Sequence, residues 1–283
     1  MKRGIKAIIA GVIIAVGGII MLVCALGASG WDIQQVNDWE VETKNFETKI
    51  TKLKMEVNVG KVIITPGTDK VVVTYEYNDV YQPQIEQNND VLSIQTAKRH
   101  WYQLIQFGFV DAPTMQIEIP QGWLSEMDLI LNAGSLQVDT GDWGQLIEVQ
   151  VNAGAANFGE VTTEIINVDI NAGAFNAKKI ASNKVDCDIS AGAFNCKEII
   201  CEQFDCDISA GAVEVGKLDS AKIDLSVSAG GATLSLVGTK TDYNIKVDKS
   251  AGSCNVTSQT NVNATRKLDI DVSAGSANIK FAN

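Results

Sequence analysis

The sequence predicts an all-β protein, a single-stranded β-helix-like solenoid with rungs of about 19–20 residues, preceded by one N-terminal transmembrane helix. Three observations predict this architecture. A long uncharged segment lies near the N-terminus, a short motif recurs at near-constant spacing, and apolar and polar residues alternate around each copy of that motif.

The N-terminal segment comprises residues 7–28, which are 22 uncharged and mostly apolar residues. As a helix they span roughly 33 Å, enough to cross the hydrocarbon core of a membrane. A cleaved signal peptide is the alternative, since residues 25–28 resemble a cleavage site. However, the apolar region of a signal peptide is shorter than this segment. The basic residues in positions 1–6 predict a cytoplasmic N-terminus, and residues 29–48 are expected to be an extracellular spacer.

The recurring motif is Ala-Gly preceded by Asn or Ser. It occurs eight times, at spacings of 20, 19, 19, 19, 19, 22 and 23 residues. We interpret each copy as a tight corner between two strands, with glycine free to adopt a positive φ. The corner glycines are Gly134, Gly154, Gly173, Gly192, Gly211, Gly230, Gly252 and Gly275.

Around each corner the residues alternate between apolar and polar. The positions seven, five and three residues before the glycine are apolar, with Lys249 as the exception, and alternation resumes after it in pairs such as Phe175 and Ala177. This period of two indicates strands with one buried face. A unit this short cannot bury its own apolar face, so residues 126–283 are predicted to stack as regular rungs about 4.8 Å apart. An antiparallel sandwich is the alternative architecture.

Residues 49–125 form a less regular β region that is expected to cap the rod. Its strand-like runs are 61–65, 71–77, 91–96 and 114–119. The segment 100–110, which begins with His100 and is rich in aromatic residues, is interpreted either as a packed cap or as an inserted binding loop.

Charge limits the function classes. The chain has 23 Lys and Arg against 34 Asp and Glu, and its formal net charge is −11. This balance argues against nucleic-acid binding, which depends on clustered basic residues. With a single histidine, His-rich metal sites and serine or cysteine triads are not expected. We therefore predict a protein that is not an enzyme and that needs no cofactor.

The sequence resembles the putative-adhesin domain family of bacterial surface proteins. The resemblance rests on residues 57–67 (VNVGKVIITPG), residues 117–120 (IEIP) and the repeated corners, and it covers roughly residues 46–281. It implies a non-catalytic surface protein, similar to single-pass membrane proteins of Gram-positive bacteria. The family offers no catalytic motif that could be transferred to this chain.

Outward acids recur at repeat-defined positions, and carboxylate oxygens are ligands that Ca²⁺ accepts. The alternative is a solvated acidic face that keeps the rod soluble. The calcium candidates are Asp186, Asp188, Asp205, Asp207 and Asp224.

Asn157, Asn176 and Asn195 are predicted to form a polar ladder along the rod, and Asn255 and Asn278 have the same offset from their glycines. The ladder is interpreted as structural, with a sugar-binding strip as the alternative. Cys187 and Cys206 occupy one inward position in successive rungs, either as small core residues or as a disulfide.

The predicted function is a membrane-anchored, extracellular binding or adhesin-like module that contacts a protein or glycan. The alternative is a regulatory or stress-sensing accessory protein of the cell envelope that acts through protein contacts. The predicted location is the cell membrane, with the C-terminal domain outside.

Overall fold

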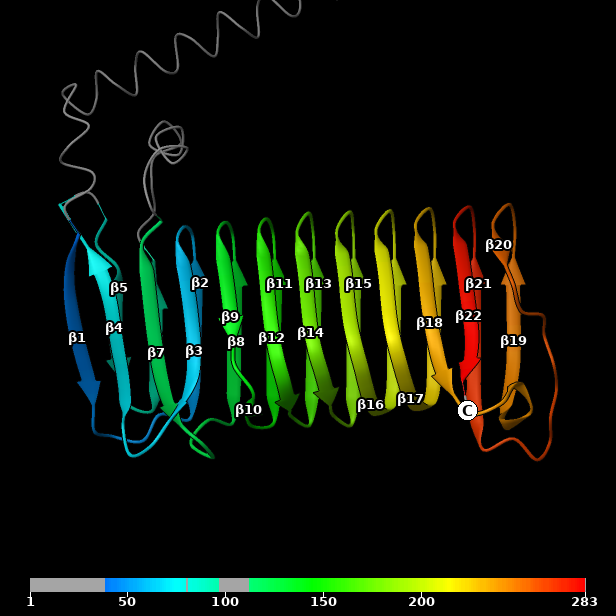
Figure 1. Ribbon diagram of the computed structural model, residues 1–283, viewed down its shortest axis with the longest axis horizontal. Coiled ribbons are helices and arrows are strands. Elements are labelled where there is room, and N and C mark those ends of the chain that lie inside the picture. Colours follow the sequence, from blue (N-terminus) through cyan, green and yellow to red (C-terminus); the bar gives the residue numbers. More distant parts are fainter. Residues whose placement is uncertain (1–38, 80, 97–111, 283) are drawn as a thin grey trace, which may run out of the picture.

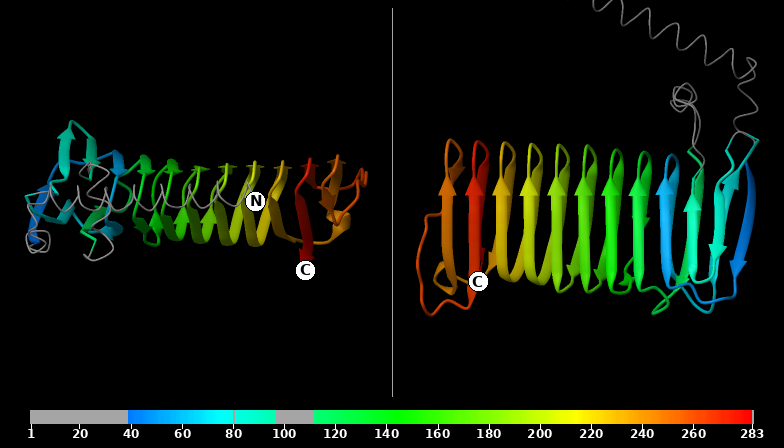
Figure 2. Two further views of the ribbon diagram at one scale, coloured as in Figure 1. Left: turned by 90° about the horizontal axis from the view of Figure 1, so that it is seen from above. Right: turned by 180° about the vertical axis from the view of Figure 1, so that it is seen from behind.

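The computed structural model describes residues 39–79, 81–96 and 112–282. These residues form a flattened coil of β-strands in two layers, with the corners aligned along one edge (Figures 1 and 2). Each rung has one strand in each layer, and neighbouring rungs pair in parallel register. The predicted solenoid is confirmed, and the antiparallel sandwich is wrong.

The first sheet contains the strands that precede the corners, and β5 extends it by pairing antiparallel with β6. In spatial order its strands are β5 (Gln84–Asn88), β6 (Val91–Gln95), β2 (Lys52–Val57), β8 (Glu126–Leu131), β11 (Leu146–Val151), β13 (Ile165–Ile170), β15 (Lys184–Ile189), the second halves of β16 (Ala193–Ile208) and β17 (Ala212–Val227), β21 (Arg266–Val272) and β19 (Tyr243–Lys249).

The second sheet contains the strands that follow the corners, and β1 and β4 extend it by antiparallel pairing. In spatial order they are β1 (Glu40–Phe46), β4 (Val71–Tyr77), β7 (Thr114–Pro120), β3 (Lys61–Gly67), β9 (Ser135–Val138), β12 (Ala155–Thr162), β14 (Ala174–Ala181), the first halves of β16 and β17, β18 (Gly231–Val237), β22 (Ser276–Ala282) and β20 (Ser253–Cys254). The short β10 (Gly141–Asp142) also pairs with β12, and η3 (Lys240–Asp242) follows β18.

The rungs do not follow chain order at either end of the stack. The β2–β3 rung lies between the β6–β7 rung and the β8–β9 rung. At the other end, the β21–β22 rung lies between β17–β18 and the outermost β19–β20 rung. The regular middle of the solenoid therefore carries one rearranged rung at each end.

Inward positions of the rungs form one continuous core. The residues predicted to face inward are buried, including Phe175, Ala177 and Cys187, except that Val247 in the outermost rung is half-buried. The rings of Phe175 and Phe194 stack with centroids 5.2 Å apart and planes 10° apart. Lys249, the exception in the predicted pattern, is exposed in the outermost rung, where no further rung covers its position.

The corner glycines are required mainly by close approach between rungs. A Cβ atom on Gly211 would lie 2.6 Å from the carbonyl oxygen of Gly192, and the same relationship recurs along the stack. Among the eight predicted corners a positive φ occurs only at Gly134 and Gly154, so backbone conformation does not explain the other six. Gly60 belongs to the same column, because its carbonyl accepts a 3.0 Å hydrogen bond from the amide of Ser135.

The β region before the regular rungs contributes complete rungs as well as edge strands. The predicted run 71–77 is β4, and the runs 61–65, 91–96 and 114–119 correspond to β3, β6 and β7 with small differences at their ends. Antiparallel pairing between the described strands occurs only in the pairs β1–β4, β4–β7 and β5–β6, all at the N-terminal end.

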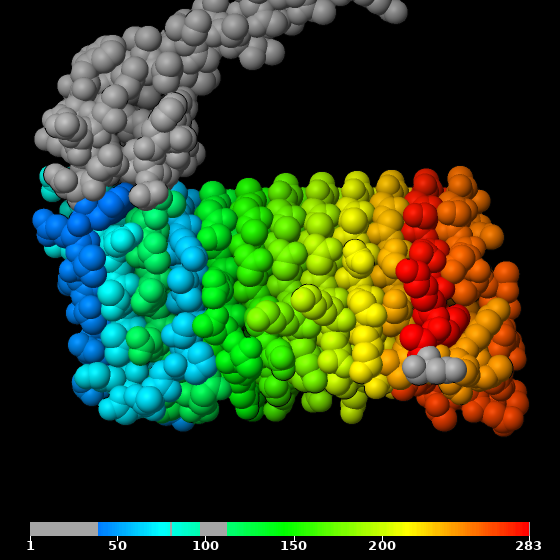
Figure 3. Space-filling model, viewed as in Figure 1, coloured from blue at the N-terminus to red at the C-terminus, as the bar shows by residue number. Residues whose placement is uncertain are grey.

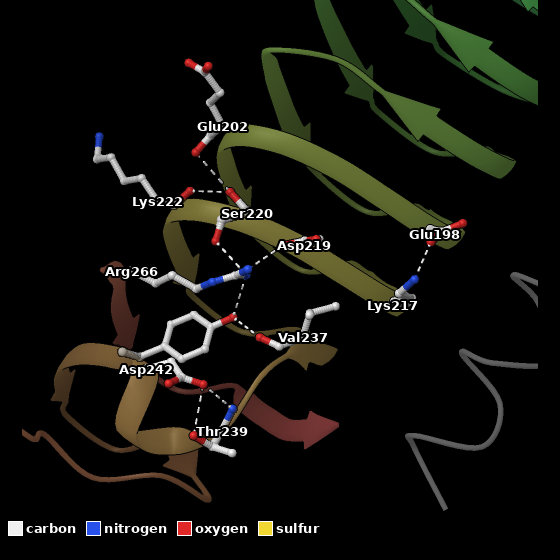
Figure 4. Close-up of polar contacts among 11 residues, drawn as sticks. Glu198, Glu202, Lys217, Asp219, Ser220, Lys222, Val237, Thr239, Asp242 and Arg266 are labelled. Atoms are coloured by element: carbon white, nitrogen blue, oxygen red, sulfur yellow. Dashed lines mark hydrogen bonds and ion pairs between the residues drawn. The ribbon is translucent and has the colours of Figure 1, made fainter. Parts of the chain in front are cut away.

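A polar cluster joins the last rungs at the C-terminal end (Figure 4). The Arg266 guanidinium lies 2.7 Å from a carboxylate oxygen of Asp219, and it donates to the carbonyl of Ser220 and the hydroxyl of Tyr243 at 3.3 Å. The Tyr243 hydroxyl in turn donates to the carbonyl of Val237 at 2.7 Å. Arg266 therefore ties the rearranged rung to its neighbours on both sides.

Candidate functional site

The outward side of the first sheet is strongly acidic. We define the acidic face as the positions eight, six and four residues before each corner glycine, from β2 to β19. Its carboxylates are Glu56, Glu126, Asp128, Glu148, Asp169, Asp186, Asp188, Asp205, Asp207, Asp224, Asp248, Asp269 and Asp271. Its lysines are Lys52, Lys54, Lys184, Lys222, Lys246 and Lys267. The acidic face therefore carries thirteen carboxylates and six lysines.

The outward side of the second sheet has a different composition. We define the amide face as the positions three and five residues after each corner glycine. Two acids, Asp139 and Glu214, and three lysines, Lys178, Lys197 and Lys280, occupy it. Figure 3 shows this face, which extends along the whole stack of rungs. The excess of negative charge thus lies on the acidic face of the solenoid.

The predicted calcium candidates stack in two columns of the acidic face. Asp186, Asp205 and Asp224 lie opposite one another in register, and Asp188 lies opposite Asp207. The structure therefore brings the five acids together as neighbours on consecutive rungs. Among residues 39–79, 81–96 and 112–282, no group of three or more His, Cys, Asp or Glu side chains is arranged to hold a metal ion. Calcium binding by these acids stays a prediction.

A lysine compensates part of this negative charge. Lys184 Nζ lies 2.6 Å from a carboxylate oxygen of Asp186 and 3.4 Å from one of Asp205. The hydrogen bond to Asp186 raises the pKa of Lys184.

Asp188 has a raised pKa in this arrangement. Partial burial, followed by the charges of Asp186, Asp207 and Asp169, raises the pKa of its carboxyl group. The charged form of Asp188 is therefore disfavoured, and a bound cation would stabilise that charged form.

Two shallow grooves adjoin each other on the acidic face. One lies over β2, β5, β6 and β8, and the other lies over β8, β11, β13 and β15. Both are lined by Asp128 and Ile130, so they adjoin at these residues, and we call the two grooves together the depression. The sequence interpretation identified the acids of this face but not the grooves or their apolar lining.

The predicted amide ladder is present on the amide face. The Asn176 amide donates to the Asn157 side-chain oxygen at 3.1 Å, and the Asn195 amide donates to that of Asn176 at 3.0 Å. Asn255 departs from the prediction, because its amide group pairs with the backbone of Ile279 at 2.8 Å in both directions. Glu214 lies opposite Asn195, and Thr233 lies opposite Asn278. Glu214 and Thr233 therefore separate Asn278 from the ladder.

A second amide ladder lies at the corners themselves. Its hydrogen bonds join Asn132 to Asn58 at 2.9 Å, Asn152 to Asn132 at 2.7 Å, and Asn171 to Asn152 at 2.7 Å. The sequence signal for this second ladder was an asparagine two residues before each of three predicted corner glycines. Asn58 was missed because its corner, Asn-Val-Gly, lacks the alanine of the motif.

Lysines beside the amide ladder pair with an acid. Glu198 lies 2.6 Å from Lys217 and 3.6 Å from Lys179, and Figure 4 shows the shorter contact. The hydrogen bond from Lys217, with a smaller contribution from Lys179, lowers the pKa of Glu198.

The cysteines of the solenoid are free thiols. Cys187, Cys196, Cys201 and Cys206 are buried and Cys254 is half-buried. Burial raises the pKa of Cys187 well above its ordinary value, that of Cys196 to about 12 and that of Cys201 to about 11. Cys187 and Cys206 are thus small core residues, and the alternative of a disulfide between them is not realised.

Several predictions concern residues outside the described part. The transmembrane helix at 7–28, the basic flank at 1–6 and the segment 100–110 with His100 all lie there. No helix able to span a membrane is found in the part of the chain that the structure describes.

Comparison with known proteins identifies the family. The family model described as Toastrack DUF4097 matches residues 50–283. The chain belongs to this family. No curated protein matches the sequence.

Solved structures share the Toastrack architecture at low sequence identity. A putative adhesin from Parabacteroides merdae has 12% identity and a TM-score of 0.56, with 86% of this chain and 97% of that chain covered. A putative lipid binding protein from Parabacteroides distasonis has 14% identity and a TM-score of 0.55, with 85% and 96% covered. A putative adhesin from Bacteroides fragilis has 13% identity and a TM-score of 0.50, with 86% and 97% covered. At such identities the similarity shows the fold.

Proposed function

We propose that this Toastrack protein is a membrane-anchored, extracellular and non-catalytic binding module that presents one face of its solenoid to a protein partner. The observation that carries the proposal is the separation of charge between the two faces. Alternation alone requires only polar residues at outward positions, and the amide face meets that requirement with few charges. The acidic face instead places carboxylates in register, at a cost in mutual repulsion.

Burial, followed by the charges of neighbouring carboxylates, raises the pKa of Asp188, so the charged form is disfavoured at this position. A surface that opposes folding in this way is typical of residues kept for binding. The structural neighbours described as adhesins and as a lipid binding protein support a surface module of this general kind.

The proposed anchor is the apolar segment 7–28, with the N-terminus in the cytoplasm. Cell fractionation tests it: the full chain should sediment with membranes and resist extraction at high salt. A variant without residues 7–28 should appear in the soluble fraction. Recovery of both forms in the soluble fraction would refute the anchor.

Photo-crosslinking in producing cells tests the binding role. A photoreactive residue would replace Glu148 on the acidic face or Asn176 on the amide face, both on regular rungs. We expect a discrete protein adduct from position 148 and little from position 176. An adduct with a membrane protein of the same cell would support a regulatory accessory role, and an adduct with an external protein would support adhesion. Absence of adducts from both faces would overturn the proposed function.

A further inference from the structure

The acidic face contains large apolar side chains at positions where polar residues are expected. Ile130, Leu146 and Ile165 occupy outward positions on β8, β11 and β13. Leu146 and Ile165 lie directly opposite each other in register, and Ile165 is 38% exposed. Single exposed apolar residues need no explanation, but Leu146 and Ile165 are adjacent, and Ile130 lies on the next rung, four positions nearer the corner and opposite Gln150.

The same rungs carry the two adjoining grooves of the depression. Ile130 lines both grooves, and Ile165 lines the one over β8, β11, β13 and β15. Seven carboxylates and two lysines, Lys54 and Lys184, share the lining of the two grooves. The carboxylates are Glu56, Glu86, Asp128, Glu148, Asp169, Asp186 and Asp188.

We infer that this depression binds a lysine- or arginine-rich segment of a partner protein that also carries apolar side chains. The inference rests on the proposed function and specifies its binding face and the chemistry of its partner. Long basic side chains suit the lining, because their alkyl stems pack on isoleucine while their charged ends reach carboxylates.

Other classes of ligand fit this lining less well. A bare divalent cation would make no use of Ile130 and Ile165. Nucleic acids and anionic lipid surfaces would be repelled by the excess of carboxylates. A basic segment with apolar residues uses both features of the depression.

Fluorescence anisotropy with the full-length protein in neutral lipid nanodiscs tests the inference. The probe is a short fluorescein-labelled peptide rich in lysine and containing leucine. Two control peptides replace either its lysines with glutamate or its leucines with serine. We expect saturable binding of the probe that weakens steeply with added salt, and no binding of the glutamate peptide.

Matched variants locate the site. The triple variant Glu148→Gln, Asp169→Asn and Asp188→Asn removes three exposed carboxylates from the groove. Its control, Glu118→Gln, Glu160→Gln and Glu214→Gln, removes three exposed carboxylates from the second sheet. We expect the first to weaken binding by about tenfold or more and the second by less than about twofold.

A second pair of variants isolates the apolar contribution. Ile165→Ser changes a side chain in the groove, and Ile200→Ser changes one with 39% exposure on the second sheet. Only Ile165→Ser should weaken probe binding, and it should have no effect on the serine control peptide. Thermal unfolding of each variant confirms that the solenoid is intact.

The outcomes separate this inference from the proposed function. If a protein adduct forms in cells but the probe does not bind, or binds equally to both triple variants, the inference fails and the binding role stands. If calorimetry detects Ca²⁺ binding but no peptide binding, the depression is a cation site and the inference also fails. If neither adduct nor probe binding is observed, both proposals fail.

Discussion

The backbone amide of Gly231 donates a 3.0 Å hydrogen bond to the carbonyl oxygen of Gly211 in the preceding rung. The glycine just before it, Gly230, lies against the same oxygen so closely that a Cβ atom there would overlap it. This contact explains the recurring glycine, because the corner of each rung packs directly against the corner carbonyl of the neighbouring rung.

Two adjacent substitutions distinguish this requirement from a general need for glycine. Gly230→Ala should lower the free energy of unfolding by at least about 2 kcal/mol, since the new methyl group must displace backbone. Gly231→Ala should change it by less than about 1 kcal/mol, because its Cβ would meet only the Ser276 hydroxyl at 3.5 Å. Urea unfolding followed by circular dichroism measures both. Equal losses from the two substitutions would contradict this explanation.

Arg266 is expected to stabilise the C-terminal end of the stack. Arg266→Lys should lower the free energy of unfolding by about 1–3 kcal/mol, because one ammonium cannot replace the forked contacts to Asp219, Ser220 and Tyr243. The control is Lys267→Gln, which removes a more exposed ion pair with Asp269 and should cost less than about 1 kcal/mol. Hydrogen exchange should show the loss of protection concentrated in β19 and β21. A uniform loss along the solenoid would argue against a local role.

The acidic face predicts a pH dependence of stability. The pKa of Asp188 is raised in the folded chain, so its charge destabilises the solenoid at neutral pH. That destabilisation is relieved as the pH falls through the raised pKa towards the ordinary value. Asp188→Asn should therefore raise the melting temperature at pH 7, and its advantage should shrink near pH 4. The control Glu214→Gln removes a charge from the amide face. An advantage for Asp188→Asn that is independent of pH would contradict the role of the charge.

The buried thiols predict slow alkylation of the folded protein. Cys187, Cys196 and Cys201 combine burial with raised pKa values, so little reactive thiolate is present. Among the described cysteines, half-buried Cys254 should react with iodoacetamide first. All of them should react in denaturant without a reducing agent. Mass spectrometry of the peptides measures the order, and a pair that resists alkylation in denaturant would reveal a disulfide.

The repeat made the regular rungs predictable because every rung buries residues at the same positions relative to its corner glycine. Phe175 and Ala177 face inward for the same reason as Phe194 and Cys196, so period-two alternation specified their burial. The rung order at the ends was not predictable in this way. The pairing of β21 with β17 on one side and β19 on the other depends on contacts between segments that are distant in the chain.

The candidate site was predictable only in part. The acids of the acidic face and the ladder from Asn157 to Asn195 follow directly from their offsets within the repeat. Ile130, Leu146 and Ile165 gave no comparable signal, since an apolar residue at an outward position looks like an irregularity in a single rung. Only the register of neighbouring strands shows that Leu146 and Ile165 lie side by side.

The rearranged rung at the C-terminal end constrains how the protein matures as it is synthesised. β19 pairs along its length with β21, which is made later, so residues 243–249 emerge before that partner exists. β21 must then insert between β17 and β19, two strands that are already made, rather than add to an open end of the sheet. Completion of this end therefore waits for residues 266–282, and a chain that stops before β21 would leave β19 without its neighbouring strand.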